Sequence, residues 1–413
     1  MADARAFTAL MEHLKSAYDF RTGVIMVQVE NEVGLLGDCR DQCSLAEESF
    51  NGSFPKDLHE MLKSEWSTLT DSFRDAFCGI ESQLQNEKLK WCDLLCNDVD
   101  LGELFMAYHY ARYVETVASA GREAYNIPLY TNVWQNYGDS DRDPNASLAA
   151  AGGDKSGDYP SGGAVAKMLD IWMHFAPSLD LLAPDIYLND YAKTCAKYRH
   201  RNQPLLIPEQ RRDEYGARRM WTAIGSYNAL GVAPFGIDTL SPNNIALTAH
   251  YALLSKVSHF ILAAQTRPDL MTGFFFDEIA SDGTDSSLDV NATFGSWKLC
   301  IQRSFVFGRP SAGCGIIIYT APDEFLLIGW GFQVTFESTN SSANFTGILK
   351  FEEKDVQDGK LRTVRLLNGD ETRSGKCAVM PSTDPDYGGF PISITIPART
   401  GIALCQPYAI ETE

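Results

Sequence analysis

The sequence is poor in basic residues and contains no long apolar run. Its 413 residues include 35 lysines and arginines against 54 aspartates and glutamates, which gives a net charge of −19. An acidic surface of this kind repels phosphate groups, so we expect neither nucleic acid nor an anionic membrane surface as a partner. Because no apolar run approaches the ~20 residues that span a bilayer, we also expect no transmembrane helix.

The ten cysteines lack the spacing of a metal-binding motif. Cys39 and Cys43 have helix-like spacing, as do Cys92 and Cys96, but no second pair of cysteines or histidines accompanies them at zinc-site spacing. We therefore expect ordinary thiols or one or two disulfides, with no metal site and no cofactor.

The start of the chain lacks the charged and then apolar pattern of a signal peptide, because residues 1–5 lead directly into a predicted helix. Sequons for N-glycosylation would be usable if the protein were secreted. They lie at Asn51, Asn145, Asn291, Asn340 and Asn344. Such tripeptides also arise by chance, so a cytoplasmic and a secreted location both stay open.

The chain does contain an alternation of predicted strands and helices, which later gives way to strands alone. Apolar runs predict strands at 24–29, 128–134, a segment ending at 185–187, 204–209 and 232–237. Helical periodicity in the segments between these strands predicts helices there. Strands that alternate with helices in this way are typical of a parallel sheet. We therefore assign residues 1–271 to an α/β domain of the (β/α) barrel type, with an insertion at about 33–100.

Residues 272–413 form the second predicted domain. Short apolar segments there alternate with glycine, asparagine and aspartate turns, as at 315–319, 324–329 and 392–396. Regular short strands of this kind are typical of an antiparallel β-sandwich. No catalytic constellation occurs in it, so we expect a packing or sugar-binding accessory module.

The first predicted strand ends abruptly in Glu30, Asn31 and Glu32. In an α/β barrel the C-terminal ends of the strands carry the active site. Alternate residues of a strand share a face, so Glu30 and Glu32 are expected to point the same way unless the strand is ending there. Two glutamates at a strand end are often only solvated charges.

A second strand of the same kind strengthens the functional interpretation. Residues 204–208 are mostly apolar and end at Glu209. Cleavage of a glycosidic bond needs one carboxyl group to protonate the leaving oxygen and a second to attack or to activate water. The pair Glu32 and Glu209 therefore indicates a glycosidase active site more strongly than either residue alone.

The segment Gln28-Val29-Glu30-Asn31-Glu32-Val33-Gly34 resembles the acid/base motif of family 35 glycoside hydrolases, the β-galactosidase family. The resemblance implies that Glu32, which follows Asn31, is the acid/base, and that Glu209 is the nucleophile. It also implies retaining hydrolysis of terminal β-galactosides, with Asn31 bonded to a sugar hydroxyl. Further segments at 109–114, 159–163, 183–187 and 234–238 resemble the subgroup with an extra C-terminal β domain.

Other residues at predicted strand ends are candidates for binding the sugar. Asn132, Trp134 and Tyr187 follow this pattern, although each of them is equally compatible with a packing role. Trp66 and Trp91 in the insertion offer aromatic faces for a sugar ring, but we favour the interpretation that they form the insertion's own small core.

Two other functions remain open from the sequence. The first is a retaining β-glycosidase for a glucoside, mannoside or glucosaminide, because loop geometry decides which sugar is bound. The second is a catalytically silent carbohydrate-binding protein. The oligomeric state is not determined by any of these patterns.

The resemblance also implies an incomplete barrel. A TIM barrel needs eight βα units, and in the family the acid/base strand is the fourth. The predicted fold is therefore a partial (β/α)8 TIM barrel, strands 4 to 8, followed by the β-sandwich. Unpaired strand edges favour aggregation or pairing, so we expect either a fragment of a longer product or a poorly active form.

Overall fold

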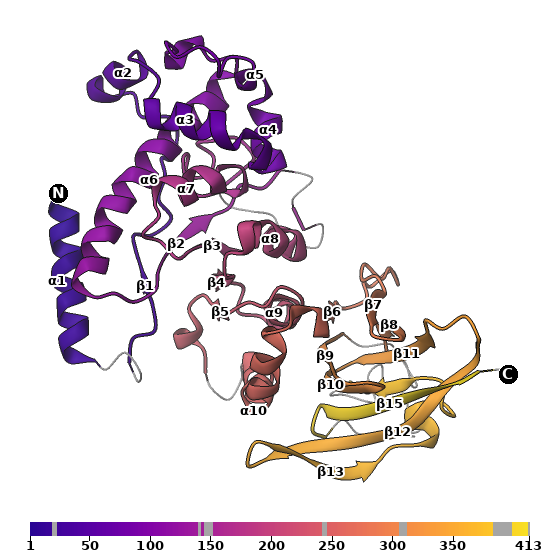
Figure 1. The fold of residues 1–413 in the computed structure, drawn as a ribbon. Helices are drawn as coiled ribbons and strands as arrows, with labels where there is room; N and C mark the ends of the chain where they lie inside the picture. Colours follow the sequence, from indigo (N-terminus) through magenta and orange to yellow (C-terminus); the bar gives the residue numbers. More distant parts are fainter. Residues whose placement is uncertain are drawn as a thin grey trace. The chain divides into compact units, whose positions relative to one another are not determined.

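The computed structural model mixes helices and strands, and it divides into two compact units (Figure 1). The first unit comprises Met1–Gln210 and Leu230–Ala233, and the second comprises Arg211–Ala229 and Pro234–Glu413. The structure describes residues 1–18, 23–138, 142–143, 152–241, 246–304, 312–382 and 399–411. The predicted strand at 392–396 and the sequon at Asn145 lie outside the described residues.

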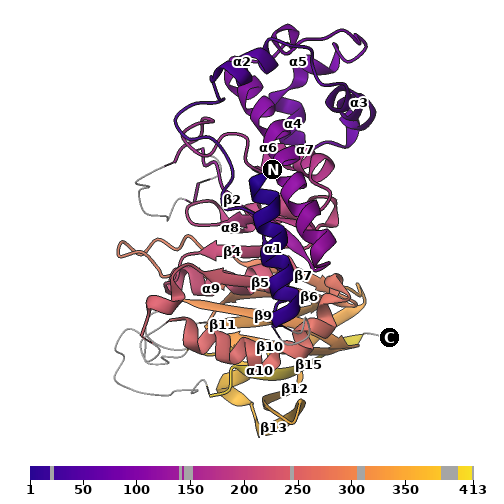
Figure 2. The same ribbon diagram turned by 90° about the vertical axis from the view of Figure 1, so that its left-hand side faces the viewer.

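Two long helices lie side by side in the first unit (Figure 2). They are α1, Ala2–Ala17, which corresponds to the helix predicted at the start of the chain, and α6, Asp98–Ala124. The side chain of Asn97 begins α6 by accepting a hydrogen bond from the Asp100 backbone at 2.9 Å. Gly121 permits the close approach, because a Cβ there would lie 2.2 Å from the Phe7 ring.

The insertion after the first strand folds as short helices. They are α2 (Ser44–Phe50), α3 (Lys56–Glu65), η1 (Trp66–Thr68), α4 (Asp71–Ala76), α5 (Cys78–Glu81) and η2 (Trp91–Asp93). Trp91 is 1% exposed and its ring lies 4.7 Å from that of Phe54, while the buried Trp66 packs against Phe73. Both tryptophans therefore belong to the core of this region, as we favoured.

Residues 80–95 form turns and the short elements α5 and η2, and no continuous helix occurs among them. The reason is that side chains of this segment form hydrogen bonds with its backbone groups, which compete with the hydrogen bonds of a helix. The Gln83 side chain donates to the carbonyl oxygen of Asp93 at 2.6 Å and accepts from the Leu95 backbone at 2.7 Å. The Asn86 side chain accepts from the Lys88 backbone at 3.0 Å. These bonds hold the segment in turns.

Parallel strands follow one another in the first unit. β1 (Val27–Gln28), β2 (Leu129–Trp134) and β3 (Leu181–Asp185) form one sheet in this order, and both pairs are parallel. A parallel bridge between Ile186 and Gln210 connects β3 to β4 (Leu206–Gln210), which pairs with β5 (Gly231–Pro234). The helices α6, α7 (Leu169–Phe175) and α8 (Tyr191–Tyr198) alternate with strands β1 to β4. The C-terminal ends of these strands therefore lie at one edge.

The first strand is shorter and more exposed than we expected. Only Val27 and Gln28 are paired, and the Ile25 side chain is 72% exposed although it lies in the predicted buried run. In the described part of the chain, β1 pairs only with β2 and is the last strand of its sheet. An end strand is covered less completely than a central one, so an apolar run there is not evidence of burial on both faces.

The second unit confirms the expectation of antiparallel sheets in the C-terminal part. One sheet has the order β13-β12-β15-β10-β9-β6 and the other β14-β11-β8-β7. The strands are β6 (Met271–Phe276), β7 (Val290–Phe294), β8 (Trp297–Arg303), β9 (Gly313–Ala321), β10 (Glu324–Trp330), β11 (Phe332–Ser338), β12 (Ala343–Gln357), β13 (Lys360–Leu366), β14 (Ala378–Met380) and β15 (Ile402–Glu411). Both sheets contribute to one core, which includes Phe274, Phe325 and Phe332.

Helices α9 (Glu214–Ser226) and α10 (Leu247–Gln265) also belong to the second unit, and α9 packs against β6. This contact requires glycine, because a Cβ on Gly273 would lie 2.0 Å from the Trp221 carbonyl oxygen. The remaining 3-10 helices are η3 (Ala166–Met168), η4 (His200–Asn202), η5 (Ile237–Thr239), η6 (Pro268–Leu270) and η7 (Gly369–Thr372).

All ten cysteines lie among the described residues. All ten cysteines are free thiols, so the ordinary-thiol interpretation is correct and the disulfide alternative is not. None of the helices in the described part of the chain has the length and apolarity that crossing a membrane would require.

Candidate functional site

Three carboxyl groups meet at the C-terminal edge of the parallel strands. Glu32 follows β1, Asp185 ends β3 and Glu209 lies near the end of β4. Each residue offers a carboxylate oxygen, and these oxygens all lie within 4.8 Å of one another. Parallel strands place their C-terminal ends together, which brings the predicted pair Glu32 and Glu209 to one site and adds Asp185 to it.

The backbone after β1 departs from a regular strand. Glu30 and Glu32 have φ values of 59° and 45°, in the left-handed region that residues other than glycine seldom adopt. The strand has therefore ended before Glu30, which is the exception allowed above, and the alternation of faces does not extend to these two glutamates. The Glu30 carboxylate instead accepts a hydrogen bond from the Tyr113 hydroxyl at 3.0 Å, while Glu32 lines a pocket.

Asn132 holds this turn in place. Its Oδ1 accepts from the Glu32 backbone N–H at 2.8 Å and from Gln28 Nε2 at 3.1 Å. Its Nδ2 donates to Asn31 Oδ1 at 3.1 Å and to Asp185 Oδ2 at 2.9 Å. Asn132 is only 2% exposed, so it acts as a buried brace for the carboxyl groups. Backbone strain at functional sites persists when the surroundings fix it in this way.

The predicted residue Asn31 lies beside the carboxyl groups and is exposed. Its Nδ2 donates to Glu32 Oε2 over 3.5 Å, the long limit of a hydrogen bond. The Asn31 side chain is therefore placed to touch Glu32.

The electrostatic environment favours protonated forms of two of the carboxyl groups. Burial raises the pKa of Glu32, and the negative charge of Glu209 raises it further. Burial, followed by the charges of Glu209 and Glu32, raises the pKa of Asp185 to about 9. A site that holds one carboxyl group protonated beside another that is ionised has the electrostatics of acid/base catalysis.

Tyr187 links the pocket to Glu209. Its hydroxyl donates to Glu209 Oε2 at 2.8 Å. Burial raises the pKa of Tyr187, and this hydrogen bond to the Glu209 carboxylate raises it further, so the phenol remains a donor. The contact therefore fixes the position of the Glu209 carboxyl group at the end of β4.

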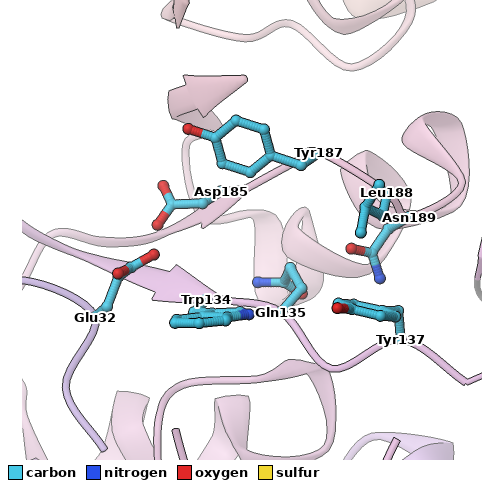
Figure 3. Close-up of a pocket in the computed structure, with 8 residues that line it drawn as sticks. All are labelled: Glu32, Trp134, Gln135, Tyr137, Asp185, Tyr187, Leu188 and Asn189. Atoms are coloured by element: carbon cyan, nitrogen blue, oxygen red, sulfur yellow. The ribbon is translucent and has the colours of Figure 1, made fainter. Parts of the chain in front are cut away.

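A pocket of about 270 Å³ opens at these side chains (Figure 3). It is lined by Glu32, Trp134, Gln135, Tyr137, Asp185, Tyr187, Leu188 and Asn189. The carboxyl groups of Glu32 and Asp185 face one another at one end, and the ring of Trp134 lies along the pocket beside them (Figure 3). Trp134 and Asp185 are register partners of β2 and β3, so sheet pairing fixes their spacing.

Of the candidate binding residues, Trp134 and Tyr187 line the pocket, whereas Asn132 and Asn31 do not. Sequence reasoning missed Asp185 and the pocket residues Gln135, Tyr137 and Asn189. Asp185 carried a usable signal, because it ends an apolar strand just as Glu209 does. The other three follow strands within loops, where no periodicity marks them.

The same carboxyl groups have the spacing of a cation site. Glu32, Asp185 and Glu209 form the group of described residues that could hold a metal ion. Carboxylate oxygens suit hard cations such as Mg²⁺ or Ca²⁺, which usually take six or more ligands.

Comparison with known proteins concerns the other unit. Residues 247–378 match a family described as a domain of unknown function (DUF5597). This segment runs from α10 to β14 and contains none of the pocket residues. No curated protein matches the chain.

Proposed function

We propose that this protein is a retaining glycosidase that hydrolyses terminal β-galactosides, with Glu209 as the nucleophile and Glu32 as the acid/base. The observation that carries the proposal is the separation of their carboxylate oxygens, which lie within 4.8 Å of one another. Retaining glycosidases place these groups about 5 Å apart, whereas inverting enzymes need roughly 6.5 to 9.5 Å to admit a water molecule.

The environments of the two residues fit these roles. Burial raises the pKa of Glu32, so it holds the proton that the leaving oxygen requires. Glu209 accepts a hydrogen bond from Tyr187 at 2.8 Å, which holds its carboxyl group in position to attack the anomeric carbon. Glu32 then removes a proton from the water that releases the sugar.

The pocket offers the surfaces that a sugar needs. The ring of Trp134 provides an apolar face for the C–H groups of a pyranose, and Gln135 and Asn189 provide amides for its hydroxyl groups. The choice of galactose rests on the resemblance of residues 28–34 to the acid/base motif of family 35 glycoside hydrolases.

The finer description of the fold is part of the proposal. The strands β1 to β4 follow one another in space as in sequence, and each connection contains a helix. This order is the one found in a (β/α)8 barrel, in which the active site lies at the C-terminal ends of the strands. We therefore interpret β1 to β5 as strands 4 to 8 of such a barrel.

A panel of nitrophenyl glycosides tests the function. We expect turnover of the β-galactoside above that of the β-glucoside, β-mannoside and β-glucosaminide, and NMR of the first product should show retained anomeric configuration. Preference for another sugar would overturn the substrate assignment and leave the mechanism standing. Saturable sugar binding without turnover of any glycoside would favour a silent binding protein instead.

The roles of the two glutamates are separated by the leaving group. Glu32→Gln should slow hydrolysis of a galactoside with a poor alkyl leaving group far more than that of an activated aryl galactoside, because only the former needs its oxygen protonated. Glu30→Gln is the matched control, since the Glu30 carboxylate bonds to Tyr113 and does not line the pocket. Equal losses on both substrates would contradict Glu32 as the acid.

A further inference from the structure

The carboxyl cluster lacks a positive charge to balance it. Among the described residues, no lysine, arginine or histidine forms an ion pair or hydrogen bond with Glu32, Asp185 or Glu209. Three ionised carboxylates with oxygens within 4.8 Å of one another repel strongly in a partly buried site. Either protons or a bound cation must therefore reduce the negative charge.

Asp185 is the most deeply buried of the three. It is 3% exposed, Asn132 Nδ2 donates to its Oδ2 at 2.9 Å, and its buried Oδ1 has no hydrogen-bond partner. The Asp185 carboxyl group faces that of Glu32 (Figure 3). An acceptor oxygen without a donor is costly when it is buried, but a hydroxyl at the same position has an acceptor within reach.

We propose that Asp185 is a third functional carboxyl group of this pocket, a neutral acid at neutral pH whose Oδ1–H donates a hydrogen bond to Glu32. The proposal about the proton concerns Asp185 alone, whereas its effect on catalysis rests on the proposed glycosidase function. In this arrangement Asp185 is a positioning residue that acts through Glu32.

Of the groups that face Asp185, the acidic side chains favour its protonated form, whereas the hydrogen bond from Asn132 Nδ2 favours the ionised form and has the smaller effect. Glu32 and Glu209 are acidic, and Tyr130 of β2 and Tyr198 of α8 are phenols whose pKa burial raises, so they bring no positive charge to Asp185. Tyr187 donates to Glu209 and leaves Asp185 without that bond. Burial followed by these negative charges raises the pKa of Asp185 to about 9.

The hydrogen bond would matter most when Glu32 is charged. In the first step the Glu32 O–H bond breaks and its proton joins the departing oxygen, which leaves a carboxylate. The Asp185 O–H then stabilises this carboxylate until Glu32 takes a proton from the attacking water, and the proton of Asp185 does not leave Asp185. A neutral carboxylic acid that donates a hydrogen bond in an apolar site is an established catalytic device.

Infrared spectroscopy tests the protonation without relying on activity. We expect a carbonyl band of a protonated carboxylic acid at neutral pH that disappears with a midpoint near the raised pKa of about 9. Asp185→Asn should remove this band, and Glu30→Gln should keep it. A band that is unchanged in Asp185→Asn, or that titrates near the ordinary aspartate pKa of about 4, would overturn the proposal.

Activity measurements separate a neutral donor from a charged group. Asp185→Asn keeps an uncharged hydrogen-bond donor and should retain galactoside hydrolysis within a few fold, whereas Asp185→Ala should lose roughly ten- to a hundredfold in kcat. Equal, severe losses in both variants would show that the negative charge is needed and would contradict the proposal. If no glycoside is hydrolysed by the unaltered protein, the glycosidase proposal fails while the infrared result still decides the state of Asp185.

A bound cation is the rival explanation, and it has its own test. Mg²⁺, Ca²⁺, Mn²⁺ and Zn²⁺ are added separately to the metal-free protein, and thermal unfolding is recorded. We expect no saturable shift that depends on Asp185. A shift that Asp185→Asn abolishes and Glu30→Gln retains would mean that the cluster is ionised around a metal, and the proposal would be wrong.

Discussion

Buried carboxylates of the β-rich second unit are balanced by cations, whereas those of the pocket in the first unit are not. In the second unit, Asp277 receives two hydrogen bonds from Arg219, at 2.9 and 2.8 Å. Glu353 pairs with Arg365 at 2.5 Å. In the first unit, Glu32 and Asp185 of the pocket and the adjacent Glu209 have neighbours of the same sign instead.

The contrast does not arise from a general lack of basic residues in the first unit. There the fully buried Glu103 contacts Lys167 at 2.6 Å, and the buried Asp170 contacts Arg201 at 2.9 Å. Removing one partner from such a pair leaves an uncompensated charge, which makes these pairs structural. Like charges held together without compensation destabilise a fold, and they are typical of functional sites.

The largest expected effect comes from removing the proposed nucleophile. Glu209→Ala should reduce galactoside hydrolysis by roughly ten thousandfold or more, because the covalent step is lost, while leaving the fold intact. Added azide should restore turnover and give a product of inverted configuration. Hydrolysis rates with NMR of the product provide the measurement. If the variant is about as active as the unaltered protein, the unbalanced carboxyl groups are not a catalytic site.

Breaking a balanced pair should affect stability and not chemistry. Arg219→Ala leaves the buried carboxylate of Asp277 with Arg218 as its basic partner among the described residues, at a longer distance of 3.4 Å. We expect a loss of about 3 to 5 kcal/mol in the unfolding free energy of the second unit. Hydrogen exchange of peptides from α9 and β6 measures this loss. The exposed Arg362→Ala is the control, and similar protection in both variants would contradict the structural role.

Stability should depend on pH through Asp185. Its pKa is raised from 3.8 to about 9 on folding, so between these values the folded protein holds a proton that the unfolded chain has released. The contribution of Asp185 to the unfolding free energy is therefore fully present below its unfolded pKa. It is lost as the pH rises towards the folded pKa, by up to about 1.4 kcal/mol per pH unit.

The matched variant for this dependence is Asp185→Asn, which cannot titrate. Hydrogen exchange of peptides from β2 and β3 should show a weaker decline of stability from about pH 5 to about pH 8 in the variant than in the unaltered protein. Parallel declines in the two proteins would mean that Asp185 is ionised throughout this pH range and would contradict the prediction.

The smallest effect concerns the hydrogen bond to the nucleophile. Tyr187→Phe removes the donor that lies 2.8 Å from Glu209 Oε2. Because this bond joins a neutral donor to a charged acceptor, we expect a loss of roughly ten- to a hundredfold in kcat/KM with unchanged stability. Kinetics combined with thermal unfolding measure both quantities. If the variant loses stability and keeps its activity, Tyr187 has a structural role and not a catalytic one.

Local sequence patterns predicted where the strands of the first unit occur better than they predicted the length and burial of each strand. The apolar runs at 128–134 and 204–209 correspond to β2 and β4, whose pattern shows directly in the residues. The run at 24–29 was misjudged, because the exposure of Ile25 follows from the position of β1 at the end of its sheet. Position within a sheet depends on long-range pairing, which a local pattern does not contain.

The sequence by itself determined which side chains end the strands, and hence that Glu32 and Glu209 are candidates for one site. Only the tertiary structure decided that Asp185 joins them and that no cation of the described residues balances the group. The end of a strand depends on a few neighbouring residues, whereas charge balance depends on which distant side chains come within a few ångströms. An apolar run predicts a strand, but only folding brings three carboxyl groups together and so shifts their pKa values.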